Sequence, residues 1–382
     1  MLAKQLVSHL DEEFDFTVYC SGKDFPKSKR LKNYGNARLR YLPLRANGVQ
    51  SIFFDSLSIM HAAFTADVLF ILGVAGAWIL PFVKTLSRKK IVILVNGIEW
   101  KRSRWNILAR WYLFWAESKA INYSHVDILD NESIQDYTAL RYGSLSRVVE
   151  YGAEHAEKIL PTEADRIRFP IITKEYTFLD YDGTDDCKYE VVLNAFKKHP
   201  SRELVVAGDY CKNKNTLREV SQLADAKNIH IQALPAASRE YLLLKTNAAT
   251  YVHAYNTAGT EPGLIEAMQL GIPAICFNIS YNITTTQNSS LYFSDSEDLG
   301  RIIRENRADE YEAIGDRLQK IAAKRYNWPR ISSLYAGIFN EALSAKEKVS
   351  ISPKFTKLPE EKLIEMGLGH LKHQQSFFET RK

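Results

Sequence analysis

The stretch YVHAYNTAGTEPGLIEAMQLGIPAICFN, residues 251–278, decides the fold of this 382-residue chain. An apolar segment ends at His253, a loop with Gly259 follows, and Pro262 stands where the first turn of a helix tolerates a missing N–H group. Pro273 lies just beyond the helical pattern and opens a second apolar segment. The stretch therefore predicts a strand, a loop, a helix and a second strand parallel to the first.

The start of this predicted helix is also a predicted anion site. Free backbone N–H groups and the helix dipole favour a diphosphate there, so the loop from Gly259 through Thr260 and Glu261 to Gly263 is a candidate binding segment. Glu266, in the first or second turn, can accept hydrogen bonds from ribose or sugar hydroxyl groups. An ordinary strand, loop and capped helix has the same spacing, so the pattern alone leaves both interpretations open.

The alternation of strands and helices extends outward over most of the chain. Five apolar segments alternate with helical ones before residue 155, and five more follow residue 175. Such alternation is typical of parallel sheets that helices cover on both faces. We predict an α/β fold of two Rossmann-like lobes with a ligand cleft between them, because ligands bind at the carboxyl ends of parallel strands. The predicted parts are an N-terminal lobe over residues 1–165, a C-terminal lobe over 166–325, a helix packing back on the first lobe over 326–345, and a charged tail over 346–382.

Length and composition exclude several classes of protein. Single hydrophobic cores stop growing at ~250–300 residues, so a chain of 382 residues is expected to form two domains. Its content of 46% apolar and 25% charged residues is typical of a globular protein and excludes a disordered or collagen-like one. A net charge of +5 is too small for a nucleic-acid binder, and the four cysteines lack the spacing of disulfides or zinc sites. The N-terminus lacks a signal-peptide pattern. The most apolar run, residues 68–83, is shorter than a membrane span and contains Pro81, so we expect a buried strand and helix there.

Several sequence blocks resemble one known family. GTEPGLIEAMQLGIPAI, residues 259–275, resembles the donor-site signature of retaining glycosyltransferases of family four, which have the GT-B fold of two Rossmann-like lobes. SYNITTTQNSSLYF, residues 280–293, is similar to the following segment of bacterial rhamnosyltransferase-like members. Blocks of the same subgroup are matched by ILGVAGA, NGIEWKRSRW, DNESIQDY and EYGAEHA, at residues 71–77, 96–105, 130–137 and 150–156. The resemblance extends to about residue 345.

The resemblance implies transfer of a sugar from a nucleoside diphosphate with retention of anomeric configuration. The subgroup points to L-rhamnose from dTDP-L-rhamnose, and to a cell-surface polysaccharide or its polyprenyl-diphosphate-linked precursor as acceptor. It implies no cofactor and no essential metal. We expect a cytoplasmic enzyme at the inner face of the cell membrane, with a glycan or lipid-linked acceptor, a peripheral membrane surface and no nucleic acid as partners.

The same resemblance assigns site residues. Glu266, Asn96 and Glu99 are the catalytic candidates, and Gly73, Gly76 and His155 face the acceptor side. The donor-binding candidates are His253, Gly259, Thr260, Glu261, Gly263 and Asn282. Lys212 and Lys214, just after the strand VVAGD, are further cationic candidates for the diphosphate, although solvated surface lysines would look the same.

The chain also departs from the family. Relatives open with a strand and a glycine-rich loop before the helix that starts this chain, and Asn96 replaces an aspartate and cannot act as a carboxylate base. Asp182 and Thr184 stand where relatives carry an arginine and a glutamate, and an aspartate repels a diphosphate. Ala258 and Ile283 replace a glutamate and an arginine, the former commonly so in this subgroup.

These departures keep two other functions open. The first is a weakened or inactive GT-B relative that acts as a binding partner, which would not hold a nucleotide sugar. The second is an enzyme of the same architecture, such as a sugar epimerase, that releases an altered nucleotide sugar without an acceptor. For the enzyme, the sequence predicts that Glu266→Ala abolishes turnover and leaves the melting temperature nearly unchanged.

Five of the six tryptophans lie between Trp78 and Trp115, interleaved with arginine and lysine over residues 99–119. A basic, aromatic helix of this kind can lie in a bilayer interface. The same residues could equally pack a core helix, so the sequence leaves interface and core open.

Overall fold

The computed structural model describes residues 2–10, 12–184, 186–208, 222, 225–236, 238–305, 308–345, 348 and 361. The chain forms two compact units. Unit 1 comprises Met1–Lys101, Trp105–Tyr151 and Trp328–Lys382, and unit 2 comprises Arg102–Arg104 and Gly152–Asn327. The sequence placed the change of lobe after residue 165, whereas the structure places it between Tyr151 and Gly152. Nearly all of the predicted charged tail lies outside the described residues.

Unit 2 is built on one six-stranded parallel sheet with the order β10-β9-β8-β11-β12-β13. Counted along the chain, this is the order 3-2-1-4-5-6 of a doubly wound fold, whose direction reverses between β8 and β11. β9 is buried at five of six positions, as expected of a strand that helices cover on both faces. The strands are β8 (Tyr176–Asp180), β9 (Glu203–Gly208), β10 (Ile229–Ala233), β11 (Thr250–His253), β12 (Ala274–Phe277) and β13 (Leu291–Phe293).

Most of the described helices of unit 2 alternate with its strands along the chain. Their apolar side chains and those of the sheet form a core that includes Leu193, Phe196, Val252 and Leu299. The helices are α6 (Glu163–Arg168), η5 (Pro170–Thr173), α7 (Tyr189–Lys197), α9 (Arg239–Thr246), α10 (Pro262–Gln269), α11 (Ser280–Thr285), α12 (Ser296–Glu305) and α13 (Ala308–Arg325). The sequence also favours a helix over NTLREVSQLADAK, residues 215–227, but this segment lies almost entirely outside the described residues.

Unit 1 contains two sheets. Four parallel strands have the order β4-β5-β6-β7, and a separate three-stranded sheet has the order β1-β3-β2, with β1 and β3 parallel and β2 antiparallel. The strands are β1 (Thr17–Ser21), β2 (Asn33–Tyr34), β3 (Ala37–Leu42), β4 (Val68–Leu72), β5 (Lys90–Val95), β6 (Val126–Leu129) and β7 (Arg147–Val148).

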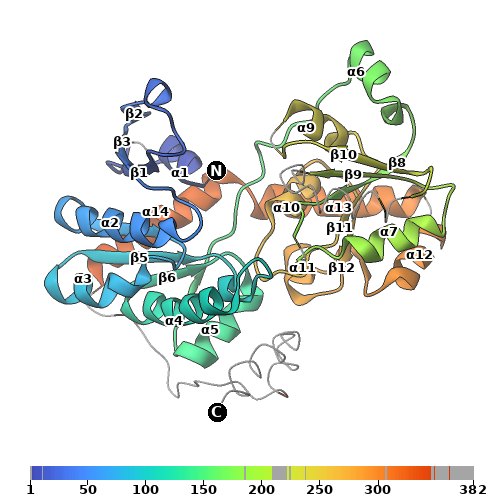
Figure 1. The fold of residues 1–382 in the computed structure, drawn as a ribbon. Coiled ribbons are helices and arrows are strands. Elements are labelled where there is room, and N and C mark those ends of the chain that lie inside the picture. Colours follow the sequence, from blue (N-terminus) through green and yellow to red (C-terminus); the bar gives the residue numbers. More distant parts are fainter. Residues whose placement is uncertain are drawn as a thin grey trace. The chain divides into compact units, whose positions relative to one another are not determined.

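The last described helix, α14 (Trp328–Ser344), belongs to unit 1. Figure 1 shows this helix, near the red end of the colour scale, among the blue elements of the N-terminal part. Trp328, Tyr335 and Phe339 share a core with Leu2 and Leu6 of the first helix. The other helices of unit 1 are α1 (Leu2–His9), η1 (Lys27–Lys29), α2 (Gln50–Thr65), η2 (Ala77–Ile79), α3 (Leu80–Leu86), η3 (Glu99–Lys101), α4 (Ile107–Tyr123), η4 (Glu132–Ile134) and α5 (Gln135–Tyr142).

The structure confirms the predicted α/β class, since each unit contains a parallel sheet of four or six strands together with helices. The apolar run over residues 68–83 forms β4, η2 and the first half of α3, as the sequence predicts. Within the described part of the chain, no helix combines the length and apolar character that crossing a membrane requires.

Candidate functional site

Two polar side chains mark the reversal point of the unit 2 sheet. Asp180 ends β8 and His253 ends β11, and these strands pair in parallel up to Leu179 and Val252. Both residues therefore lie at the carboxyl edge of the sheet, between the two strands where the winding direction changes. In open parallel sheets, ligands bind at this position.

Helix α10 begins beside this edge. The loop that leads to it contains Gly259 at φ +125°, a backbone conformation that glycine adopts without strain. Pro262 occupies the first turn, and Glu261 precedes it with no side-chain cap on the helix. The carboxylate of Glu261 instead accepts a hydrogen bond of 2.8 Å from Thr257 Oγ1.

Glu266 of α10 is held by two basic side chains. Its carboxylate accepts hydrogen bonds from Lys245 Nζ at 2.6 Å and from His155 Nε2 at 3.2 Å. Burial alone would raise the pKa of Glu266, but the hydrogen bonds from His155 and Lys245 and the charge of Lys245 outweigh it and lower the pKa to about 2. Glu266 is therefore an ionised acceptor that remains partly open to solvent.

Lys245 is an unusual neighbour because its side chain is only 2% exposed. It projects from α9 into a cluster with Asp180 and Tyr251, with its ammonium 5.5 Å from the centre of the Tyr251 ring. Burial raises the pKa of Asp180 to about 6, although the Lys245 charge and a hydrogen bond from Tyr241 act in the opposite direction. A buried lysine is stable only when carboxylates compensate its charge, and Glu266 and Asp180 do so here.

Gly263 allows the first turn of α10 to approach this cluster. A Cβ atom at Gly263 would lie 2.9 Å from both Asp180 Oδ2 and the Tyr251 hydroxyl oxygen. Real Cβ atoms do not approach that closely, so with a larger residue either the helix start or the Asp180 and Tyr251 side chains would have to shift. The glycine thus permits the close approach of the helix start and the cluster.

His253 has a buried ring nitrogen without a hydrogen-bond partner among the described residues. The residue is 1% exposed, and the nitrogen without a partner is its Nε2. The Tyr251 hydroxyl lies 3.4 Å from the other ring nitrogen, Nδ1. Burial and the nearby Lys245 charge lower the pKa of His253 to about 3, so the ring is neutral at pH 7. A buried nitrogen without a partner is costly unless a ligand satisfies it.

Other predicted donor residues have different surroundings. Thr260 is buried in the loop before α10. The Nδ2 group of Asn282 is 3.2 Å from the carbonyl oxygen of Tyr255 and 2.9 Å from that of Phe277, so it ties together the ends of β11 and β12. Lys212 and Lys214 lie outside the described residues.

His155 was predicted on the acceptor side. The structure places it in unit 2, in contact with Glu266, because the change of lobe precedes it. In the loop after β8, Asp182 Oδ1 accepts hydrogen bonds from the backbone N–H and the hydroxyl of Thr184, at 3.0 and 2.7 Å. Asp182 and Thr184, two positions that depart from the family pattern, thus form one local turn.

The remaining acceptor-side candidates lie in unit 1, at the carboxyl edge of its four-stranded sheet. Asn96 follows β5 and accepts a hydrogen bond of 3.2 Å from the Tyr151 hydroxyl, and Glu99 accepts one of 2.9 Å from Trp105 Nε1. Gly73 follows β4 with φ +94° and open space where a side chain would be.

Gly76 lies against Asp55 of α2, since an added Cβ would be 2.6 Å from Asp55 Cβ. Burial raises the pKa of Asp55 to about 7. The sequence analysis did not identify Asp55, because its sequence neighbours are the same as those of a surface aspartate on an amphipathic helix.

Sequence reasoning also missed Lys245 and Asp180. A signal existed for Lys245, because it stands in the apolar run YLLLK, four residues after Tyr241 and therefore on the same buried face of a helix. Among the described residues, no group of three or more histidine, cysteine, aspartate or glutamate side chains could hold a metal ion. The absence of a cofactor stays a prediction.

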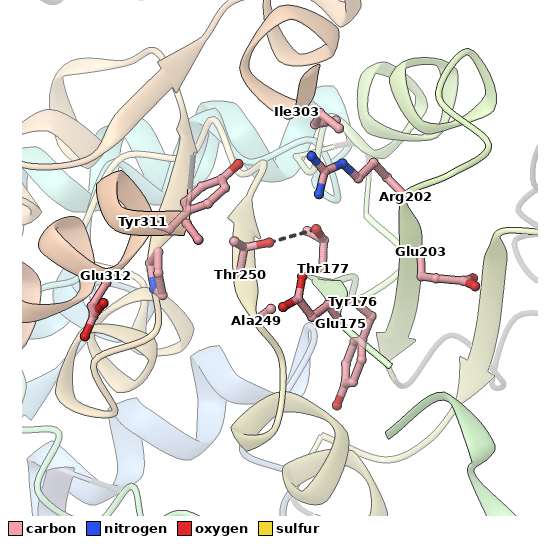
Figure 2. A pocket seen from close by; sticks show the side chains of 12 residues that line it. Glu175, Tyr176, Thr177, Arg202, Glu203, Ala249, Thr250, Ile303, Tyr311 and Glu312 are labelled. Carbon is pink, nitrogen blue, oxygen red and sulfur yellow. Dashed lines mark hydrogen bonds between the residues drawn. The ribbon is translucent and has the colours of Figure 1, made fainter. Parts of the chain in front are cut away.

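Figure 2 shows a hollow of about 490 Å³ elsewhere in unit 2. Thr177 and Thr250 share a hydrogen bond of 2.7 Å on its floor, and Arg202 and Tyr311 lie around it. Thr177, Arg202 and Thr250 lie at the amino ends of β8, β9 and β11, at the opposite end of the strands from Asp180 and His253, and Tyr311 is on α13. The hollow is therefore separate from the candidate site.

Comparison with known proteins identifies the architecture. The family described as "Domain of unknown function (DUF1972)" matches residues 2–154. None of the curated proteins matches the sequence. A sucrose-phosphate synthase from Thermosynechococcus elongatus is 13% identical with a TM-score of 0.74, covering 90% of this chain and 93% of its own.

Two further solved structures give the same result. HepE from Anabaena in complex with UDP-glucose is 13% identical with a TM-score of 0.63, over 80% of this chain and 87% of its own. A glycosyltransferase from Rickettsia africae is 13% identical with a TM-score of 0.60, over 82% and 86% of the two chains. The chain therefore has the GT-B fold of these solved structures, as the sequence predicted.

Proposed function

We propose that this protein is a glycosyltransferase that binds a nucleotide-sugar donor at the reversal point of the unit 2 sheet. The observation that carries the proposal is the unpartnered Nε2 of His253, buried near Lys245, the residue whose ammonium also holds the ionised Glu266 of α10. The similarity of fold to HepE, which was solved with UDP and with UDP-glucose, supports a nucleotide sugar as the ligand.

Each group has a role that its chemistry suits. The first-turn amides of α10 and the loop from Gly259 to Gly263 bind the diphosphate. Glu266 accepts hydrogen bonds from ribose hydroxyls, and His253 Nε2 bonds a hydroxyl of the sugar. Following the sequence resemblance, we propose dTDP-L-rhamnose as donor and a surface polysaccharide or lipid-linked precursor as acceptor.

The proposed reaction retains the anomeric configuration. The bond between the anomeric carbon and the diphosphate oxygen breaks, and the electron pair leaves with the diphosphate. The acceptor hydroxyl oxygen forms its bond to the same face of that carbon, and its proton passes to the leaving diphosphate. Pre-organised amides that stabilise the developing negative charge are the main contribution of such a site, and no metal or cofactor is required. Asn96 and Glu99, with Gly73 and Gly76, are the proposed acceptor-side residues.

Calorimetric titration tests the donor assignment. We expect dTDP, UDP or GDP, and the matching sugar nucleotide, to bind with a dissociation constant between micromolar and millimolar, roughly 4–8 kcal/mol. His253→Phe should weaken the sugar nucleotide about tenfold and leave the free nucleoside diphosphate unaffected, because His253 contacts the sugar. Glu312→Gln, at the opposite end of the strands, is the matched control.

The alternative is a non-catalytic relative that binds a glycan or a working transferase. By the family resemblance, Asp182 stands where relatives carry a cation, and an aspartate there would repel a diphosphate, which favours this alternative. If none of the three nucleotides binds the wild-type protein while its fold is intact, the donor assignment is wrong and the alternative replaces it.

We also propose that unit 1 binds a membrane surface through the α3–α4 face, which comprises Phe82, Leu86, Leu108, Trp111 and Trp115. These side chains are exposed, with Leu108 at 76% and Trp111 at 60%, and α3 packs on α4. The ammonium of Lys119 lies 5.4 Å from the Trp115 ring. Aromatic and basic residues side by side on a helix favour a bilayer interface, which decides against the core interpretation for these positions.

Sedimentation with vesicles tests this surface. We expect binding to anionic phosphatidylglycerol vesicles that falls at least tenfold in Leu108→Ser, because the side chain inserts among the acyl chains. Leu160→Ser is a matched control, since Leu160 is also 76% exposed but lies in unit 2. Equal binding by both variants would remove the α3–α4 face from consideration.

A further inference from the structure

Helix α2 of unit 1 carries an exposed apolar stripe. The α2 stripe consists of Phe53, Leu57, Met60 and Phe64. A turn of 100° per residue places these four side chains within about 60° of one another around the helix axis. All four are exposed, Phe53 at 60% and Phe64 at 85%. The helix therefore presents a continuous apolar line to the solvent.

The composition of α2 is unusual for a helix at a protein surface. Its sequence, QSIFFDSLSIMHAAFT, contains no lysine or arginine, and its ionisable side chains are those of Asp55 and His61. The helix already packs on β4, and the side chains that it buries in unit 1 are those of Phe54, Ser56 and Ile59. A helix that is apolar on its outer side as well as its inner side is typical of a buried position. The α2 stripe thus has the character of an interface.

The α2 stripe is symmetric about its midpoint, because its residues follow one another at intervals of 4, 3 and 4. In an antiparallel pair with a two-fold axis between Leu57 and Met60, Phe53 of each copy lies opposite Phe64 of the other. Leu57 of each copy then lies opposite Met60. A two-fold interface requires a surface that is complementary to itself, and intervals of 3 and 4 are those with which two helices interlock along a seam.

We propose that α2 of a second copy of this chain covers the α2 stripe in an antiparallel, two-fold pair. Full burial of a phenylalanine removes roughly 150–250 Å² from solvent, so the exposed parts of Phe53 and Phe64 correspond to roughly 220–360 Å² per copy. Leu57, Met60 and Val49, which are also exposed, add about as much again. Two copies would bury about 1,000 Å² in total, the lower limit of a specific interface. We therefore expect a dimer that forms as the protein concentration rises, not a permanent one.

A lipid surface suits the α2 stripe less well. Helices that lie in a bilayer interface combine an apolar face with basic side chains that attract anionic headgroups, and α2 has no lysine or arginine. The α3–α4 face differs in this respect, because it has the ammonium of Lys119 beside the Trp115 ring. The dimer goes beyond the proposed function and depends on neither the donor nor the acceptor.

Sedimentation velocity of the full chain over a range of concentrations tests the dimer. We expect the wild type to dimerise and Leu57→Asp to have a dissociation constant at least about tenfold higher, because the interface would bury two unpaired carboxylates near its axis. Leu160→Asp is the matched control, since Leu160 is an exposed leucine of unit 2. Equal melting temperatures of the three monomers would show that both substitutions leave the fold intact.

Disulfide trapping tests the antiparallel arrangement without a charge in the interface. In a Cys20→Ser, Cys211→Ser background, Phe53→Cys combined with Phe64→Cys should form a covalent dimer under a mild oxidant. Either substitution alone should not. The two positions are ~16 Å apart along one helix, whereas the Cα atoms of a disulfide lie within about 7 Å of each other. A bond within one copy is therefore excluded.

Four results would overturn the proposal. A wild type that stays monomeric at every concentration would show that no second copy binds, and a Leu57→Asp variant that dimerises like the wild type would place the interface elsewhere. Cross-linking of Phe53→Cys alone would contradict the antiparallel arrangement. Binding of the wild type to phosphatidylglycerol vesicles that Leu57→Asp abolishes and Leu160→Asp preserves, in proteins that are all monomeric, would show that a membrane covers the α2 stripe instead.

Discussion

Glu266→Ala is expected to abolish sugar transfer and also to lower the melting temperature of unit 2. The carboxylate is the closest partner of the buried Lys245 ammonium, at 2.6 Å. Breaking a buried pair leaves an uncompensated charge and costs about 3–5 kcal/mol. For a unit of this size each kcal/mol lowers the melting temperature by roughly 2–4 °C. The sequence alone predicted a nearly unchanged melting temperature, because Lys245 had not been recognised as its partner.

A double variant separates the two effects. Adding Lys245→Met removes the orphaned charge, so thermal unfolding should recover most of the lost stability while transfer stays absent. Differential scanning calorimetry with a turnover assay measures both quantities. If Glu266→Ala has the melting temperature of the wild type, the buried charge of Lys245 is not stabilised by Glu266. If the double variant regains activity, Glu266 is not a catalytic residue.

Asp180→Asn is expected to change the pH dependence of stability between pH 6.5 and 4.5. His253 has a folded pKa of about 3 and an unfolded value near 6.5, so the unfolded state binds the extra proton and stability falls as the pH falls through this window. Asp180 has the opposite effect on stability as the pH falls. Its folded pKa of about 6 exceeds the unfolded value of 3.8, so the folded state gains a proton as the pH falls from 6 to 3.8.

The two effects offset each other in the wild type, whose stability should be nearly flat from pH 6 to 4.5. Below pH 4.5 it should fall steeply, because Glu266 also loses the stability that its low folded pKa provides. In Asp180→Asn the His253 effect is no longer offset by Asp180, so between pH 6 and 4.5 stability should fall by about 1.4 kcal/mol per pH unit more steeply than in the wild type. Urea unfolding at pH 7, 5.5 and 4.5 measures this, with the exposed Glu312→Gln as control. Parallel pH curves for Asp180→Asn and the wild type would contradict the assignment.

The strand and helix pattern could be predicted from the sequence because burial in parallel sheets is visible as apolar runs. KIVILV and ELVVAG are buried at nearly every position and form β5 and β9. The three-residue β13 was missed, since a strand so short has no periodicity to detect.

The candidate site was only partly predictable. The position of Glu266 followed from helix spacing and the family resemblance, and His253 from the end of a strand. The partners of these residues come from distant segments: Lys245 from α9, His155 from the start of unit 2 and Asp180 from β8. Local spacing does not reveal such contacts, which depend on the strand order of the sheet.

The position of α14 has a consequence for synthesis on the ribosome. Every residue of unit 2 has been made once the chain reaches Asn327, whereas the core of unit 1 includes Trp328, Tyr335 and Phe339. Chains fold from the N-terminus as they emerge, yet here the core of the N-terminal part includes a helix that is made after all of unit 2. The later unit is thus the first that can finish folding, and the nascent N-terminal sheet is a natural client for chaperones until α14 arrives.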